Sequence, residues 1–226
     1  MNIVLIHGTT QAPAGWLALS TILTAHGHCV RLVDLPVDQP DLLAEDYADI
    51  AARQCGDVDA PVAVAHSAGG LVLPAIGRRL NAAHLVWLSA TIPDPTGQRS
   101  FAEEISAYGA EMFGREWLEL REPPTVDPVV SAYFLFHDCD LQTLRWALST
   151  VRLFYPAAVY HEKSPTFDGL APSTFVLPRA GRSLRPDWMR TTARQRLGIE
   201  AVEVDAGHCP HVSRPDVVAE IIERIS

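Results

Sequence analysis

Residues 61–70 read PVAVAHSAGG, and this stretch decides the expected fold of the chain. The apolar run at residues 61–65 predicts a buried β-strand, and a helical pattern begins at Ala68. Between them stands Ser67, in a tight turn that requires small neighbours. A serine in such a turn projects its hydroxyl above the sheet, and the first N–H groups of the helix point at whatever it holds. Ser67 is therefore a candidate nucleophile, and the alternative is a buried turn serine without chemistry.

Short apolar runs alternate with amphipathic stretches along most of the chain. Apolar strands separated by helices indicate a mostly parallel sheet covered by helices on both faces, so the expected class is α/β. Reactive side chains should then gather at the carboxyl ends of the strands. The expected strands are residues 2–6, 29–33, 62–65, 85–89, 174–177 and 201–204, and the expected helices are residues 14–26, 41–55, 68–80, 140–154, 186–195 and 214–225.

The alternation breaks between about residue 94 and residue 169, a segment that is rich in proline and has helical patterns but no convincing strand. A helical insertion over the carboxyl ends of the strands would form a cap that excludes water and shapes a pocket. We therefore expect one domain over residues 1–226 with a cap at about 94–169. The cap aromatics either line an apolar pocket or attach the cap to the core. They are Phe101, Tyr108, Phe113, Trp117, Tyr133, Phe134, Phe136 and Trp146.

The composition restricts the possible partners. The 226 residues are 48% hydrophobic and carry a net charge of −9 without a basic cluster, which disfavours nucleic acid and leaves a small molecule as the expected partner. The N-terminus lacks the basic region of a signal peptide, and no apolar run reaches the length of about 18 residues that a membrane span needs. The four cysteines form no CxxC pair, so we expect reduced thiols and a cytoplasmic protein. The oligomeric state stays open.

A second loop follows the first predicted strand and begins with His7 and Gly8. This loop can place the N–H of Thr9 opposite the N–H of Ala68, and the two donors would form an oxyanion hole. A plain turn, in which Gly8 allows an unusual φ, is the alternative. The other residues expected around the substrate are His7, Gly8, Thr10, Trp16 and His66.

A histidine in the last loop completes the candidate chemistry. His208 follows the last predicted strand and precedes the last helix, so it can reach Ser67 and act as general base. His211 is the competing base. Neither the cluster of His208, Cys209 and His211 nor the run at residues 137–140 has the ligand spacing of a common zinc site, so we expect no metal and no cofactor.

These features resemble a known family. With His7-Gly8 and Trp16, the HSAGG motif at residues 66–70 and the DAGH motif at residues 205–208, the chain is similar over nearly its whole length to small α/β-hydrolases, the class of plant methylesterases, hydroxynitrile lyases and bacterial esterases. The resemblance implies an α/β-hydrolase fold with a helical cap. It also implies Ser67 as nucleophile, His208 as base, and Thr9 and Ala68 as donors to the oxyanion.

The acid that normally orients the histidine in this family is missing from its expected place. By resemblance it should follow the penultimate strand, and the residue at that position is Gly181. Loss of the carboxylate costs on the order of 10⁴ in kcat in model serine proteases. Asp94, just after the strand expected at 85–89, and Asp138, in the cap, are the candidate replacements, and a solvated or helix-capping carboxylate is the alternative for each. Asp205 lies too close to His208 in sequence to orient it.

The leading hypothesis is a serine hydrolase, an esterase for a small and fairly apolar ester or acyl compound. A lyase, isomerase or cyclase could use the pair of Ser67 and His208 for proton transfer alone. A catalytically silent binding protein is the third hypothesis, and the presence of both residues argues against it.

Overall fold

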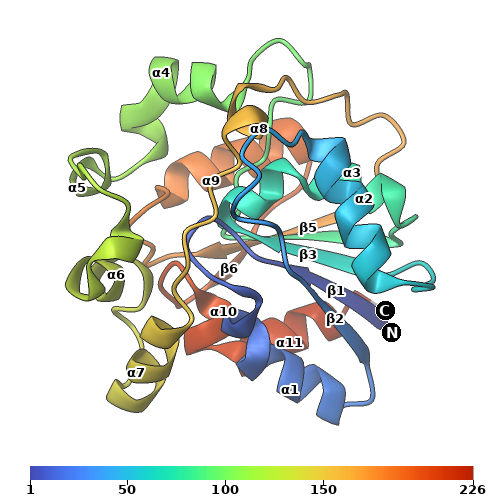
Figure 1. Ribbon diagram of the computed structural model, residues 1–226, viewed down its shortest axis with the longest axis horizontal. Coiled ribbons are helices and arrows are strands. Elements are labelled where there is room, and N and C mark those ends of the chain that lie inside the picture. The colour runs from blue at the N-terminus through green and yellow to red at the C-terminus, as the bar shows by residue number, and fades with distance from the viewer. Residues whose placement is uncertain (226) are drawn as a thin grey trace.

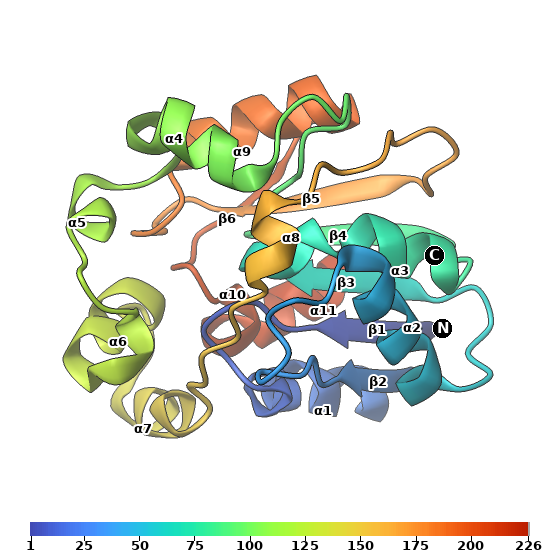
Figure 2. The ribbon, with the colours of Figure 1, turned by 45° about the horizontal axis from the view of Figure 1, so that its top comes forward.

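A six-stranded parallel sheet forms the centre of the molecule, for which a computed structural model describes residues 1–225. Its strands lie in the order β2-β1-β3-β4-β5-β6. Figure 1 shows the sheet at the centre with helices around it, and Figure 2 labels all six strands. Every neighbouring pair is parallel, so the predicted α/β class is confirmed. The strands are β1 (Asn2–Ile6), β2 (Cys29–Val33), β3 (Val62–His66), β4 (His84–Leu88), β5 (Ser173–Pro178) and β6 (Val202–Val204).

Helices cover both faces of the sheet, and each face has its own apolar core. On one face lie α1 (Leu17–Ala25) and α11 (Pro215–Glu223), which also contact each other. On the other face lie α2 (Ala44–Cys55), α3 (Leu73–Arg79) and α9 (Pro186–Thr192). Strands buried on both faces read as continuous apolar runs, which is why the sequence pattern located them within one or two residues.

Several helices are shorter or more broken than the sequence pattern predicted. The expected helix at 14–26 begins as a 3-10 turn, η1 (Pro13–Trp16), before α1. The expected helix at 68–80 is divided into a 3-10 turn, η2 (Ser67–Leu71), and α3. Pro74 lies in the first turn of α3, and because proline has no N–H it cannot continue a helix that began at Ser67. The expected helix at 140–154 ends at Ser149 as α7 (Leu141–Ser149).

The segment between β4 and β5 is helical, and Figure 2 shows its helices beyond the carboxyl ends of the strands. It contains α4 (Phe101–Met112), α5 (Arg115–Leu118), η3 (Pro124–Val126), α6 (Pro128–Leu135), α7 and α8 (Ala157–His161). Three of these helices begin at side-chain caps, from Ser100 for α4, Asp127 for α6 and Asp140 for α7. Within residues 94–169 the structure shows isolated bridges but no strand. None of the helices described over residues 1–225 is long and apolar enough to cross a membrane.

Candidate active site

Ser67 occupies the turn between β3 and η2, and its backbone is left-handed with φ of 53°. A residue other than glycine in this region costs about 1–3 kcal/mol and persists only where the surroundings enforce it. The N–H of Thr91 holds the turn, because it donates to the carbonyl oxygen of Ser67 at 3.0 Å. Ser67 is half-buried and lines a cavity, so its strained backbone presents the hydroxyl to a space that a ligand can enter.

Two glycines bring the loop after β1 against the Ser67 turn. A Cβ atom on Gly8 would lie 2.7 Å from the carbonyl oxygen of His66 and 2.8 Å from Cβ of Ser67. A Cβ atom on Gly69 would lie 2.6 Å from the carbonyl oxygen of His7. All three distances are too short for real contacts, so only glycine lets these backbones meet. The peptide of Thr9 is therefore held beside Ser67, where its carbonyl oxygen accepts a hydrogen bond from the N–H of Phe154 at 2.7 Å.

His208 lies beside Ser67, and its Nε2 is 3.2 Å from the Ser67 hydroxyl. The loop that carries His208 is held at two points: the N–H of Gly207 donates to Asp138 at 2.7 Å, and the carbonyl oxygen of His208 lies 3.0 Å from Nε2 of His66. Burial lowers the pKa of His208 well below its usual range, and His66 lowers it further. The imidazole is therefore neutral at pH 7, which is the form that can accept a proton.

The other ring nitrogen of His208 faces a serine. Nδ1 of His208 lies 3.0 Å from the hydroxyl of Ser89, which follows β4 and is completely buried. Ser89 also has a left-handed backbone, with φ of 49°. Ser89 is not among the site residues predicted from the sequence. The one sequence feature that could have identified Ser89 was its position. It ends the strand predicted at 85–89, at the sheet edge where Ser67 and His208 were expected to meet.

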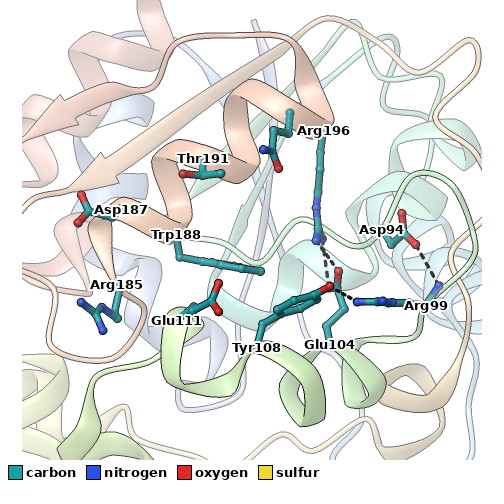
Figure 3. Close-up of a pocket in the computed structure, with 11 residues that line it drawn as sticks. Asp94, Arg99, Glu104, Tyr108, Glu111, Arg185, Asp187, Trp188, Thr191 and Arg196 are labelled. Carbon is teal, nitrogen blue, oxygen red and sulfur yellow. Dashed lines mark hydrogen bonds and ion pairs between the residues drawn. The ribbon is translucent and has the colours of Figure 1, made fainter.

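The two carboxylates considered as the missing acid have other partners. Asp94 accepts hydrogen bonds from backbone N–H groups of Thr96, Gln98 and Arg99 in its own loop. Asp94 lines a separate polar cleft of about 620 Å³ together with Arg196. Figure 3 shows both side chains in that cleft. The structure therefore does not bring Asp94 to His208.

Asp138 comes closer to the histidine loop but reaches its backbone. One carboxylate oxygen accepts from the N–H of Gly207, and the other is buried without a hydrogen-bond partner among residues 1–225. Asp138 thus ties the cap to the loop of His208 and does not bond to the ring. A Cβ atom on Gly181 would meet its nearest neighbour at 3.6 Å, so the position expected for the acid has room for a side chain.

Three of the residues expected around the substrate lie beneath the site. His7 accepts the N–H of Leu35 at 3.0 Å, and burial lowers the pKa of His7 to about 4. Burial likewise lowers the pKa of His66 to about 4. Trp16 is buried and packs edge-on against His66, with ring centroids 6.3 Å apart. These side chains support the loops from below, whereas Thr9 and Thr10 line the cavity.

His211, the competing base, points elsewhere. Its Nε2 lies 2.9 Å from the side-chain oxygen of Gln11, and its ring packs against Trp16 with centroids 4.2 Å apart. The structure does group His66, Cys209 and His211, whose possible ligand atoms all lie within 4.8 Å of one another. The imidazoles of His66 and His211 lie with ring centroids 4.5 Å apart at an interplanar angle of 60°.

A cavity of about 340 Å³ lies above Ser67 and His208. Most of its lining is apolar and comes from the segment between β4 and β5, and no aspartate, glutamate, lysine or arginine contributes to it. Tyr160 adds a hydroxyl 3.3 Å from that of Thr9, and burial raises the pKa of Tyr160 to about 12, so this phenol is neutral. The apolar lining comprises Ala68, Phe101, Ile105, Phe113, Trp117, Leu118, Pro123, Pro124, Leu153 and Leu184.

The cap aromatics divide between the two roles considered from the sequence. Phe101, Phe113 and Trp117 line the cavity. Phe134 and Phe136 are buried in a cluster with Ala147 of α7 and Val212 of α10 (Pro210–Ser213), so they attach the cap to the core. The cavity lined by Phe101, Phe113 and Trp117 therefore suits an apolar ligand.

Comparison with known proteins places the chain among hydrolases. The model of the alpha/beta hydrolase family matches residues 3–221. Salicylic acid-binding protein 2 of Nicotiana tabacum is 27% identical over 186 residues, which cover 71% of this chain and 69% of that protein. The structure of polyneuridine aldehyde esterase aligns with a TM-score of 0.82 and 18% identity, covering 99% of this chain and 98% of that one. A methylesterase from Arabidopsis aligns with a TM-score of 0.75 and 16% identity, covering 100% and 98%. The resemblance stated from the sequence motifs and the expected α/β-hydrolase fold are confirmed.

Proposed function

Because this chain belongs to the alpha/beta hydrolase family, we propose that it is a serine esterase that cleaves a small, uncharged and mostly apolar ester. One observation carries the proposal: the Ser67 hydroxyl lies 3.2 Å from Nε2 of His208 at the base of a cavity. This is hydrogen-bond distance, so the neutral imidazole can take the proton as the serine oxygen attacks a carbonyl carbon.

The reaction follows from the positions of these groups. Ser67 bonds to the ester carbonyl carbon, and its proton moves to Nε2 of His208. The N–H groups of Thr9 and Ala68 would then stabilise the oxyanion. Ala68 suits this role because it lies in the first turn of η2, whose N–H groups have no carbonyl partner within the helix. His208 next gives the proton to the departing alcohol oxygen. Water, deprotonated by His208, then cleaves the acyl-serine to release the acid and restore Ser67.

The character of the cavity limits the substrate. A free carboxylate or an ammonium group in the substrate would lose its hydration without gaining an opposite charge, because none of residues 1–225 that line the space is an aspartate, glutamate, lysine or arginine and His208 is neutral. The ester should therefore be neutral, with both its acyl and its alcohol portions in contact with aliphatic and aromatic side chains. The names of the esterases that share this fold support the same reaction class.

A fluorophosphonate probe tests the proposal directly, because it labels only a serine that an adjacent base activates. We expect labelling of the wild-type protein and of Ser106→Ala, which removes an exposed hydroxyl from α4, and no labelling of Ser67→Ala. Hydrolysis of neutral aryl esters should be lost together with labelling. A well-folded wild-type protein that neither labels nor cleaves any aryl ester would overturn the proposal.

One observation favours a second candidate. The partner of Nδ1 of His208 is a neutral hydroxyl, and no carboxylate stabilises the imidazolium that ester cleavage requires. A lyase or isomerase that only moves a proton needs less of that stabilisation. Such an enzyme would resist the probe and would exchange an activated carbon-bound hydrogen of a bound ketone with deuterated solvent. A protein that binds ligands but shows neither reaction would be a silent binding module.

A further inference from the structure

Ser89 is placed against His208 by a backbone that a serine rarely adopts. Its φ of 49° is left-handed, yet the residue is completely buried and its N–H donates to the carbonyl oxygen of Val176 in the neighbouring strand at 2.9 Å. The hydroxyl then lies 3.0 Å from Nδ1 of His208. Residues other than glycine with a left-handed backbone cluster at functional sites, where the side chain has to point in one particular direction.

We propose that Ser89 is the positioning residue of His208 and stands in for the absent carboxylate; this inference rests on the proposed function of the pair formed by Ser67 and His208. The imidazole bonds at one end to Ser67 and at the other to Ser89. The two serines follow adjacent strands, β3 and β4, and His208 follows β6, so the parallel sheet itself brings the three side chains to one edge.

A hydroxyl orients the ring differently from a carboxylate. It accepts the N–H of Nδ1 in the productive tautomer, which leaves the lone pair of Nε2 free for the Ser67 proton. It can also donate to Nδ1, and Nε2 then carries the proton and cannot act as base. A carboxylate only accepts, so it selects the productive tautomer and stabilises the imidazolium. Ser89 therefore fixes the ring plane but selects its tautomer weakly.

Among residues 1–225, no carboxylate bonds to the ring of His208, whose two nitrogens face serine hydroxyls. His66 of β3 packs against the ring of His208, and His211 of α10 packs against His66; burial lowers the pKa of both His66 and His211 well below neutrality, so both are uncharged at pH 7. The carboxylate of Asp138, from the cap, bonds to the backbone of Gly207. His208 consequently works as a neutral base of low pKa, and its proton-accepting form persists into mildly acidic solution.

Three variants test the assignment. In Ser89→Ala, kcat for a neutral aryl ester should fall about tenfold, the factor that one neutral hydrogen bond supplies, while KM stays unchanged. Ser89→Gly, which suits the left-handed backbone, should show the same loss and serves if the alanine variant does not fold. Thr192→Val is the matched control, because it removes a buried hydroxyl that donates to the carbonyl oxygen of Trp188 within α9, away from the cavity; its kcat should not change.

Replacement by a carboxylate gives the sharper readout. Aspartate tolerates a left-handed backbone better than most residues, and in Ser89→Asp its charge should raise the pKa of His208 by about 1–3 units. The acidic limb of the profile of kcat/KM against pH should move upward by the same amount, and kcat on its plateau should rise. If the side chain at position 89 does not face the imidazole, this limb should stay where it is in the wild-type protein.

Nuclear magnetic resonance of the imidazole nitrogens tests the same assignment without any turnover. The wild-type protein should show His208 as a mixture of tautomers, Ser89→Ala should change their ratio, and Ser89→Asp should give a single form protonated at Nδ1. If the tautomer ratio and the titration of His208 are the same in all three proteins, Ser89 is not the positioning residue. Because these signals need no substrate, that result is distinguishable from failure of the esterase proposal, which the fluorophosphonate probe reports.

Discussion

Replacement of Gly8 by alanine should inactivate the enzyme with a modest loss of stability. The added Cβ would lie 2.7 Å from the carbonyl oxygen of His66 and 2.8 Å from Cβ of Ser67, against contacts of about 3.4 Å or more in packed interiors. The loop must therefore move by about half an ångström or more, and it carries the N–H of Thr9 away from the oxyanion. Loss of one such donor costs a factor of about 10²–10³ in kcat, or about 2.7–4 kcal/mol.

The matched control is Gly77→Ala, whose Cβ would lie at a similar distance, 2.7 Å, from a methyl group of Leu85. That methyl is the end of a flexible side chain far from the cavity, so the protein should lose about 1–3 kcal/mol of unfolding free energy at most and keep its kcat. The assays are kcat and KM with a neutral aryl ester, and urea unfolding of each variant. If folded Gly8→Ala keeps kcat within about threefold of wild type, the loop after β1 supplies no oxyanion donor and the reasoning fails.

Three further predictions concern stability and the missing acid. Glu104→Ala removes the carboxylate that pairs with the partly buried guanidinium of Arg196 and leaves it, among residues 1–225, only the carbonyl oxygen of Ile92 as acceptor; this should cost about 3–5 kcal/mol in urea unfolding, whereas an unchanged midpoint would contradict it. Burial lowers the pKa of His7 and His66 to about 4, so the unfolded chain binds more protons than the folded one below pH 6.5; unfolding free energy should fall by about 1.4 kcal/mol per pH unit for each histidine from pH 6.5 to about 4, and a flat profile would refute it. Gly181→Asp should fold normally and add little turnover while Ser89 holds the histidine, but should raise turnover in the Ser89→Ala background; additive effects would show that the two positions do not compete.

The fold was predictable because its signals are local. The inner strands are continuous apolar runs, and β1 was located without error. Residues 29–33 were also located without error, although β2 is an edge strand with Arg31 exposed. The predicted helix ends were wrong where a single proline or a single helix-capping side chain acts within one helical turn. Pro74 divides the predicted helix after Ser67 because proline has no N–H to donate. The spacing of apolar residues, from which the helix was predicted, gives no information about a single missing N–H group.

The positions expected to line the pocket were less predictable. Thr10 lines the cavity, but His7, Trp16 and His66 lie under the loops as buried packing. Side chains next to a site residue in sequence point alternately toward the cavity and toward the core. The sequence of one chain does not show which of them point in which direction. The same holds for Asp138, which reaches the loop of His208 by its carboxylate but bonds to the backbone of Gly207.

The sequence by itself determined the parallel sheet, the turn at Ser67 and the candidacy of His208, because each depends on residues within one strand and the turn that follows it. It also showed that no acid stands at Gly181. Only the tertiary structure decided what faces the far nitrogen of His208. Ser89 lies 119 positions away from that histidine, and its direction depends on a left-handed backbone that no local motif announces. Ser89 and His208 are in contact because β4 and β6, which are far apart in the sequence, run parallel and end at the same edge of the sheet.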